Sequence, residues 1–219
     1  MSSFAPLGVE CDGDTIRITM NRPERHNALA ADHLLELRDA FAEAGRSDAT
    51  GIVLGADGPV FSAGHDFADV AARELTGVRE LLELCTELMR TIQSVPQVVV
   101  ARVHALATAA GCQLVTSCDL AVAAESAGFA LPGGKGGWFC HTPAVPVARA
   151  VGRKRLMEMA LTGDVVDAPT RARMGPGQSR GARRRAGRRG RRAARSRDPR
   201  QSGEQGARQA DALRAARPS

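Results

Sequence analysis

The sequence lacks several features that would assign the protein to a membrane, secreted or metal-binding class. It has no apolar run of membrane-spanning length, and its first 13 residues are too short and too polar for a signal segment. Its five cysteines are odd in number, and none belongs to a CxxC pair. We therefore expect reduced thiols, no metal site and a cytoplasmic protein.

Residues 176–219 lack the apolar side chains that a folded domain needs. They contain 14 arginines, no lysine, three acidic residues and no aromatic residue, and Leu213 is their one large aliphatic side chain. Because so little apolar surface can be buried, we expect a disordered tail that takes no part in the fold. Its net charge of +11 leaves −5 on residues 1–175, given +6 for the whole chain. The globular part therefore gives no electrostatic reason to bind nucleic acid.

Residues 1–175 alternate between strand-like and helix-like segments. Short apolar or alternating runs predict strands at residues 15–20, 51–55, 98–103 and 119–124. Apolar residues at helical spacing predict helices at residues 29–44, 75–92, 111–117, 144–151 and 153–161. This alternation predicts one α/β domain with a covered sheet.

Two loops of small residues follow predicted strands. Phe61-Ser62-Ala63-Gly64-His65-Asp66 comes after a strand and a turn, and Ala107-Thr108-Ala109-Ala110-Gly111-Cys112-Gln113 opens a helix. Small residues let a ligand approach the backbone, and unpaired N–H groups at a helix N-terminus favour negative charge. Facing each other, the loops would form a two-amide oxyanion hole that stabilises a thioester enolate. Each loop alone is more often a packing feature.

Together with their surroundings, these loops resemble the crotonase (enoyl-CoA hydratase/isomerase) family. The motifs occur in order and with the family's spacing across residues 15–175. They are Asn21-Arg22-Pro23-Glu24-Arg25-His26-Asn27-Ala28-Leu29, Phe61–Asp66, Ala109–Gln113 with Ser117-Cys118-Asp119, and Leu161-Thr162-Gly163-Asp164. Residues 106–119 and 139–143 are most similar to the branch called enoyl-CoA hydratase domain-containing protein 3.

The resemblance implies a crotonase-like spiral of ββα units and a CoA thioester ligand, with no further cofactor and no metal. It also implies a lyase or isomerase of fatty acid metabolism, and a homotrimer or hexamer for the intact fold. By position, the oxyanion amides are those of His65 and Ala110. The other ligand-binding positions are Arg25, Asn27, Ala28, Leu29, Ala63, Gly64, Asp66 and Gly111. Arg25 would supply the cation that binds the CoA phosphates, and the alternative is a solvated surface arginine. For Asp66 we favour a role in capping a helix or fixing the loop.

The sequence departs from the family at the two catalytic glutamates, whose positions hold Gln113 and Gly133. Hydration of an enoyl thioester needs an acid/base pair, and Gln113 can orient a water without accepting its proton. His141 is the best titratable substitute, with a structural role as the alternative. Cys140 reads as a buried thiol, and we expect Trp138 to cover apolar surface beside the acyl site.

The tail also departs from the family, which continues with a turn, a strand and C-terminal helices. Removing one base from codons compatible with residues 176–182 permits Leu-Val-Asn-Arg-Val-Val-Pro, a family-like continuation, and residues 201–209 behave similarly. We therefore hypothesise a one-base insertion near codon 176. In that case residues 1–175 are an incomplete domain whose C-terminal helices are missing, and trimer formation by this chain is in doubt.

Three functional readings stay open. The first is a crotonase-fold protein acting on an acyl-CoA thioester without the standard acid/base residues. The second is a non-catalytic acyl-CoA binding protein or an inactive pseudogene product. The third is a basic tail that binds nucleic acid, carried on an inert domain.

Overall fold

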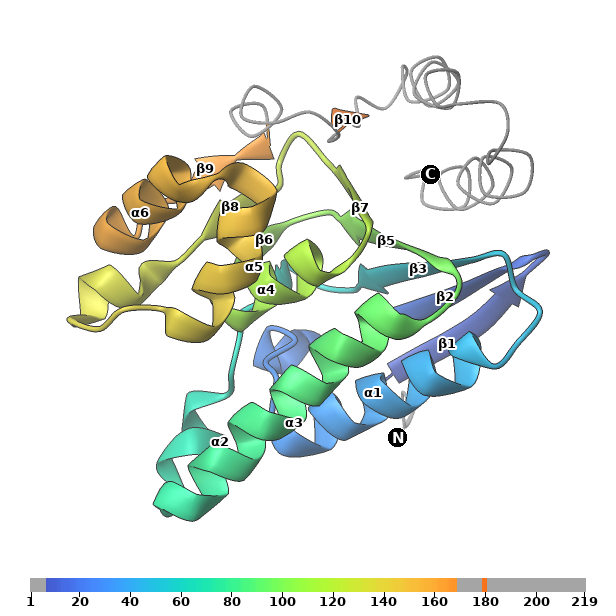
Figure 1. Ribbon diagram of the computed structural model, residues 1–219, viewed down its shortest axis with the longest axis horizontal. Helices are drawn as coiled ribbons and strands as arrows, with labels where there is room; N and C mark the ends of the chain where they lie inside the picture. Colours follow the sequence, from blue (N-terminus) through green and yellow to red (C-terminus); the bar gives the residue numbers. More distant parts are fainter. Residues whose placement is uncertain (1–6, 169–178, 181–219) are drawn as a thin grey trace.

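Two β-sheets form the framework of the structure (Figure 1). The computed structural model describes residues 7–168 and 179–180. The larger sheet contains, in spatial order, β1 (Leu7–Asp12), β2 (Thr15–Met20), β3 (Gly51–Ala56), β5 (Val98–Val103), β7 (Leu120–Ala123) and β10 (Ser179–Arg180). β1 and β2 are antiparallel, whereas the other neighbouring strands are parallel. β3 and β5 are almost wholly buried, which explains their continuous apolar sequences.

The smaller sheet is built from short strands, in the order β4 (Val60–Ser62), β6 (Leu106–Thr108), β8 (Gly128–Ala130) and β9 (Val166–Asp167). Three of them, β4, β6 and β8, each follow a long strand of the larger sheet. β4, β6 and β8 run parallel, and β9 is antiparallel to β8. In sequence, a long strand, a short strand and then helix repeat along the chain, so the structure is the expected spiral of ββα units.

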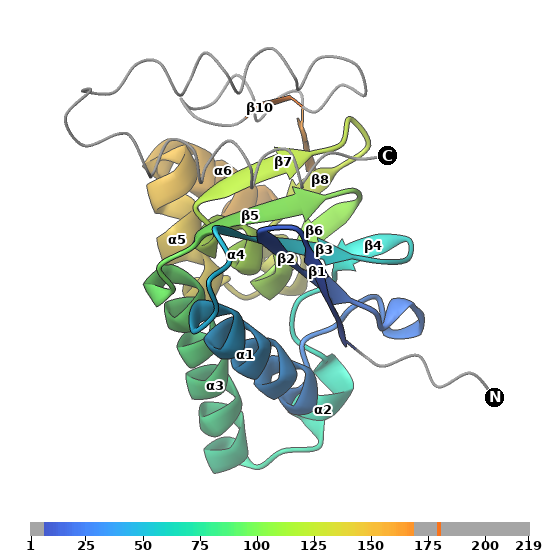
Figure 2. The same ribbon diagram turned by 90° about the vertical axis from the view of Figure 1, so that its right-hand side faces the viewer.

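Helices cover the sheets and close the core. They are α1 (Ala31–Gly45), α2 (Phe67–Ala71), α3 (Leu75–Ser94), α4 (Ala110–Ser117), α5 (His141–Val151) and α6 (Arg153–Thr162), with short 3₁₀ turns η1 (Pro23–Arg25) and η2 (Pro132–Gly136). α1 and α3 lie side by side in both views, and α5 and α6 pack at the other end of the molecule (Figure 2). α4 is buried almost throughout, which fits its small and apolar sequence.

The core is continuous from α1 and α3 to α5 and α6. Phe41 of α1, Phe61 of β4 and Phe129 of β8 are its largest fully buried side chains. Burial of an aromatic or aliphatic side chain of this size stabilises the fold by about 1.5–3 kcal/mol. The residues that position both small-residue loops are thus anchored in the same core.

The predicted elements are confirmed. The short strands β4, β6, β8 and β9, the edge strand β1 and the short helix α2 were not expected, and α5 begins three residues before the predicted residue 144. Residues 179–180 pair with β7 as the short strand β10. The expectation that residues 176–219 take no part in the fold stays a prediction. The other predictions for the tail, including disorder, the frameshift and the missing helices, fall outside the described residues.

The structure carries two further observations on protein class. In the described part of the chain, no helix combines the length and apolar character needed to cross a membrane. All five cysteines are free thiols. Burial raises the pKa of the Cys85 thiol to about 12, so this side chain behaves as a packing residue.

Candidate functional site

The two small-residue loops of the sequence lie against each other at the end of the smaller sheet. We call residues 62–66 the first loop and residues 108–110 the second loop. β4, which leads into the first loop, pairs with β6, which leads into the second. The Thr108 hydroxyl donates a hydrogen bond to the Ala63 carbonyl oxygen at 2.9 Å, which ties the loops together.

The first loop is held on its other side by the segment 26–29. Three backbone hydrogen bonds join them: Ala63 N–H donates to His26 O, Leu29 N–H to Gly64 O, and Asp66 N–H to Leu29 O, at 2.8–3.3 Å. Leu29 and His65 thus form a parallel bridge. In such a bridge the neighbours of His65 bond to the partner segment, and the N–H of His65 itself points the opposite way. This N–H has no acceptor in the part of the chain that the structure describes.

The second loop presents a similar N–H group at the start of α4. Ala109 has φ 48° and ψ −120°, a conformation that an alanine rarely adopts, and it turns the chain from β6 into the helix. Ala110 is the first residue of α4, so its N–H has no partner within the helix, and no other acceptor lies among the described residues. Strain of this kind costs on the order of 1–3 kcal/mol and is typical of functional loops.

Two glycines allow the loops to approach so closely. Gly64 has φ +84°, and a Cβ placed on it would lie 2.9 Å from Ala109 Cβ and 3.0 Å from the Ala110 nitrogen. A Cβ on Gly111 would lie 2.5 Å from the carbonyl oxygen of Ser62. Gly64 and Gly111, which were predicted as ligand-binding positions, therefore allow the two loops to pack closely. As a result the backbone N–H groups of His65 and Ala110 lie in adjacent segments.

Gln113 follows Ala110 by one helical turn and lies on the same side of α4. It is 7% exposed, and its side-chain carbonyl oxygen is buried with no hydrogen-bond donor among the described residues. Its backbone carbonyl accepts hydrogen bonds from Thr116 and Ser117. A buried amide oxygen without a donor is costly, so this position suits a water or ligand hydroxyl.

The His65 imidazole is mostly buried beside the first loop. Burial lowers its pKa, while the charge of Asp69 acts in the opposite direction. The imidazole is therefore neutral at neutral pH, and its Nε2 atom has no partner among the described residues. The sequence predicts that His65 binds the ligand through its backbone N–H group. That role does not depend on the protonation state of the imidazole.

Gly133, at the second glutamate position of the family, lies under Trp138. A Cβ at Gly133 would come within 2.8 Å of Cys140 Sγ and of the Trp138 carbonyl oxygen. Trp138 is 55% exposed, and its ring meets Phe67 of α2 edge to face at 6.1 Å. His141 is exposed at the start of α5, with its ring against Phe139.

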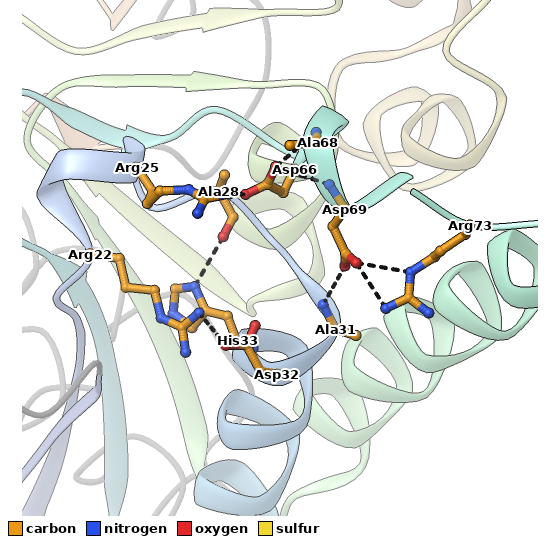
Figure 3. A network of polar contacts seen from close by, with 10 residues as sticks. All are labelled: Arg22, Arg25, Ala28, Ala31, Asp32, His33, Asp66, Ala68, Asp69 and Arg73. Carbon is orange, nitrogen blue, oxygen red and sulfur yellow. Dashed lines mark hydrogen bonds and ion pairs between the residues drawn. The ribbon is translucent and has the colours of Figure 1, made fainter. Parts of the chain in front are cut away.

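Arg25 forms an ion pair with Asp66, the residue after His65 (Figure 3). Asp66 also caps α2 by accepting hydrogen bonds from the N–H groups of Ala68 and Asp69, which confirms the expected capping role. Burial alone would raise the Asp66 pKa, but the bonds from Asp69, Arg25 and Ala68 lower it below its usual value. The carboxylate is thus charged and fixed.

A second set of polar contacts joins α1 to α2, and the sequence analysis missed it. Asp69 accepts a hydrogen bond from the N–H of Ala31 at the start of α1 and pairs with Arg73 (Figure 3). Arg22 bridges Asp32 and Glu36. The Asp69–Arg73 pair has the local i,i+4 spacing, whereas Asp69 and Ala31 are 38 positions apart, so no local spacing signals the contact between α1 and α2.

The remaining predicted ligand residues serve the backbone framework. Asn27 is fully buried, and its side chain bonds Asp57 O, Val60 O and the N–H of Arg22. Its amide is therefore occupied and acts as a brace of the backbone. Ala28 and Leu29 are also buried, and the backbone groups of Leu29 bond the first loop. Contact of these three residues with a ligand stays a prediction. Among the described residues, no three His, Cys, Asp or Glu side chains form a metal-binding group.

Comparison with known proteins agrees with this architecture. The sequence profile of the family described as enoyl-CoA hydratase/isomerase matches residues 11–176. The mitochondrial enoyl-CoA hydratase domain-containing protein 3 of Rattus norvegicus is 46% identical over 170 residues, covering 74% of this chain and 55% of the relative. The chain thus spans about half the length of the curated relatives it matches.

Two crystal structures show the same fold. Human enoyl coenzyme A hydratase domain-containing protein 3 superposes with a TM-score of 0.77 at 30% identity, covering 96% of this chain and 91% of that one. The enoyl-CoA hydratase of Mycobacterium smegmatis also gives a TM-score of 0.77, at 33% identity, covering 97% and 90% of the two chains.

Proposed function

The chain belongs to the enoyl-CoA hydratase/isomerase family, and from that premise we propose that it binds an acyl-CoA thioester at the junction of its two loops. The thioester carbonyl oxygen would accept hydrogen bonds from the N–H groups of His65 and Ala110. The observation that carries the proposal is that both groups lack an acceptor among the described residues and belong to loops in direct contact. Paired backbone donors of this kind stabilise the negative charge of a thioester enolate.

The polar groups around this junction do not support ordinary hydration. Gln113 can hold a water through its buried carbonyl oxygen, but an amide cannot take up the proton that hydration releases. Gly133 has no side chain, and Trp138 and Cys140 fill the space beside it. We therefore propose that the protein binds or polarises acyl-CoA thioesters with little or no hydration of enoyl-CoA.

The acyl group would lie toward the exposed aromatic pair. Phe67, which directly follows the first loop, is 70% exposed, and its ring meets that of Trp138, which is 55% exposed. Large exposed aromatic side chains beside a polar site favour an apolar ligand. The contact between the two rings supports the expectation that Trp138 covers apolar surface beside the acyl site.

The cellular compartment, the oligomeric state and the function of the tail do not follow from the geometry of this site, and we treat them as separate proposals. The enoyl-CoA hydratase domain-containing protein 3 of Rattus norvegicus is described as mitochondrial, whereas the sequence of this chain led us to expect the cytoplasm. A homotrimer or hexamer is the arrangement we propose for an intact family fold. Nucleic-acid binding by the Arg-rich tail stays a prediction, because that tail falls almost entirely outside the described residues.

Crotonyl-CoA tests the proposal, with binding and turnover measured on the same sample. Calorimetry should detect crotonyl-CoA binding, and loss of the enoyl absorbance should not exceed the buffer rate. A bound thioester with no turnover supports the proposal. Rapid hydration would show that another group acts as the acid/base pair, and absence of binding would remove the proposed function.

A further inference from the structure

The Arg25–Asp66 ion pair connects an exposed cation to a buried carboxylate beside the proposed thioester site. The Arg25 side chain is 55% exposed, whereas the Asp66 side chain is 8% exposed. Arg25 belongs to the η1 turn, and Asp66 directly follows His65. One contact therefore spans the segment that precedes α1 and the first loop.

Asp66 is bonded to three parts of the structure, namely Leu29, helix α2 and Arg25. Its N–H bonds the Leu29 carbonyl at 3.3 Å, and its carboxylate accepts the first N–H groups of α2. Arg25 bonds the carboxylate oxygen that does not cap the helix. The His65 N–H belongs to the Gly64–His65 peptide, whose carbonyl oxygen accepts a hydrogen bond from Leu29 N–H, while Asp66 N–H donates to the Leu29 carbonyl. Loss of the restraints on Asp66 would therefore loosen the bridge that orients the His65 N–H.

We propose that Arg25 is a positioning residue, whose ion pair with Asp66 holds the His65 N–H in the direction that a thioester oxygen requires. The proposal rests on the function proposed above. It differs from the simpler idea, raised by the sequence, that Arg25 only binds CoA phosphates. A phosphate-binding Arg25 would act equally on every CoA derivative, whereas a positioning Arg25 would act on those with a thioester carbonyl.

The preference for a thioester over free CoA separates these roles. It is measured as the Kd of CoA divided by the Kd of acetyl-CoA, so any phosphate contribution cancels. Loss of one neutral hydrogen bond of about 1 kcal/mol changes a Kd about fivefold. Arg25→Ala should therefore lower the preference about fivefold.

Three further variants make the test specific. Asp66→Asn keeps a good helix cap but removes the charge, so it should reproduce the loss seen in Arg25→Ala. Arg25→Lys retains a cation and should restore most of the preference. Arg17→Ala breaks an exposed ion pair with Asp12 at the edge of the larger sheet and should leave the preference unchanged.

The outcomes are distinct. If Arg25→Ala weakens CoA and acetyl-CoA by the same factor, Arg25 binds phosphate and the inference is overturned. An unchanged preference in Asp66→Asn overturns it as well, even if Arg25→Ala folds poorly by circular dichroism. If the unmodified protein itself shows no preference for the thioester, the proposed function fails and the inference fails with it.

Discussion

A methyl group added at Gly64 should separate the two loops and remove the thioester preference. The new Cβ would lie 2.9 Å from Ala109 Cβ and 3.0 Å from the Ala110 nitrogen, closer than these atoms can normally approach. A side chain at positive φ costs about 1–2 kcal/mol, and overpacking adds about 1–3 kcal/mol. Gly64→Ala should therefore lower the unfolding free energy by about 2–5 kcal/mol.

Gly13 supplies the matched control. It also has positive φ (+58°), but nothing lies within 4 Å of its added Cβ, so Gly13→Ala should cost only about 1–2 kcal/mol. Both variants would be titrated with acetyl-CoA and with CoA, below their melting temperatures. Gly64→Ala should bind acetyl-CoA at least about fivefold more weakly, with CoA affinity retained. Equal preference for the thioester in both variants would refute the role of the loop junction.

Three other substitutions test neighbouring parts of the structure. Burial lowers the pKa of His33 to about 4, below its value of about 6.5 in the unfolded chain, so only the unfolded chain takes up the proton between these values. Stability should fall by about 1.4 kcal/mol per pH unit as the pH drops from 6.5 to 4, and His33→Gln should flatten this slope in urea titrations. Gln113→Glu places a carboxyl group at the buried position where the Gln113 amide oxygen has no donor among the described residues. Burial should raise the pKa of the new carboxyl group, so that it can act as an acid. Hydration of crotonyl-CoA should therefore increase in Gln113→Glu and not in Gln113→Met. Gly133→Glu should lower the free energy of unfolding by about 1–3 kcal/mol in thermal unfolding, because the new Cβ would meet the Trp138 carbonyl oxygen. A gain in hydratase activity from this change alone would contradict that packing.

The long elements were predictable because their periodicity is strong. β2 alternates apolar and polar residues, β3 and β5 are apolar over most of their length, and α3 repeats buried residues at helical spacing. β4, β6 and β8 have three residues each, which is too short for a pattern to emerge. Their existence depends on pairing with one another, a long-range interaction that a local pattern does not carry.

The motifs of the site could be predicted from the sequence, but the contacts that hold these motifs in place could not. Small residues marked Gly64 and Gly111 as places of close backbone approach, and the structure shows what they approach. The direction of the His65 N–H depends on the bridge to Leu29, and the Arg25–Asp66 ion pair joins residues 41 positions apart. No sequence spacing encodes these contacts, because they arise only when the two segments pack.

Infrared spectroscopy of bound acetyl-CoA carrying a ¹³C-labelled thioester carbonyl tests the central claim most directly. Two hydrogen bonds from His65 and Ala110 would polarise the carbonyl, so its stretching band should shift to lower frequency on binding. The shift should be reduced in Gly64→Ala and retained in Gly13→Ala. A thioester that binds with an unshifted carbonyl band would contradict the account, because the two N–H groups would then not contact the oxygen.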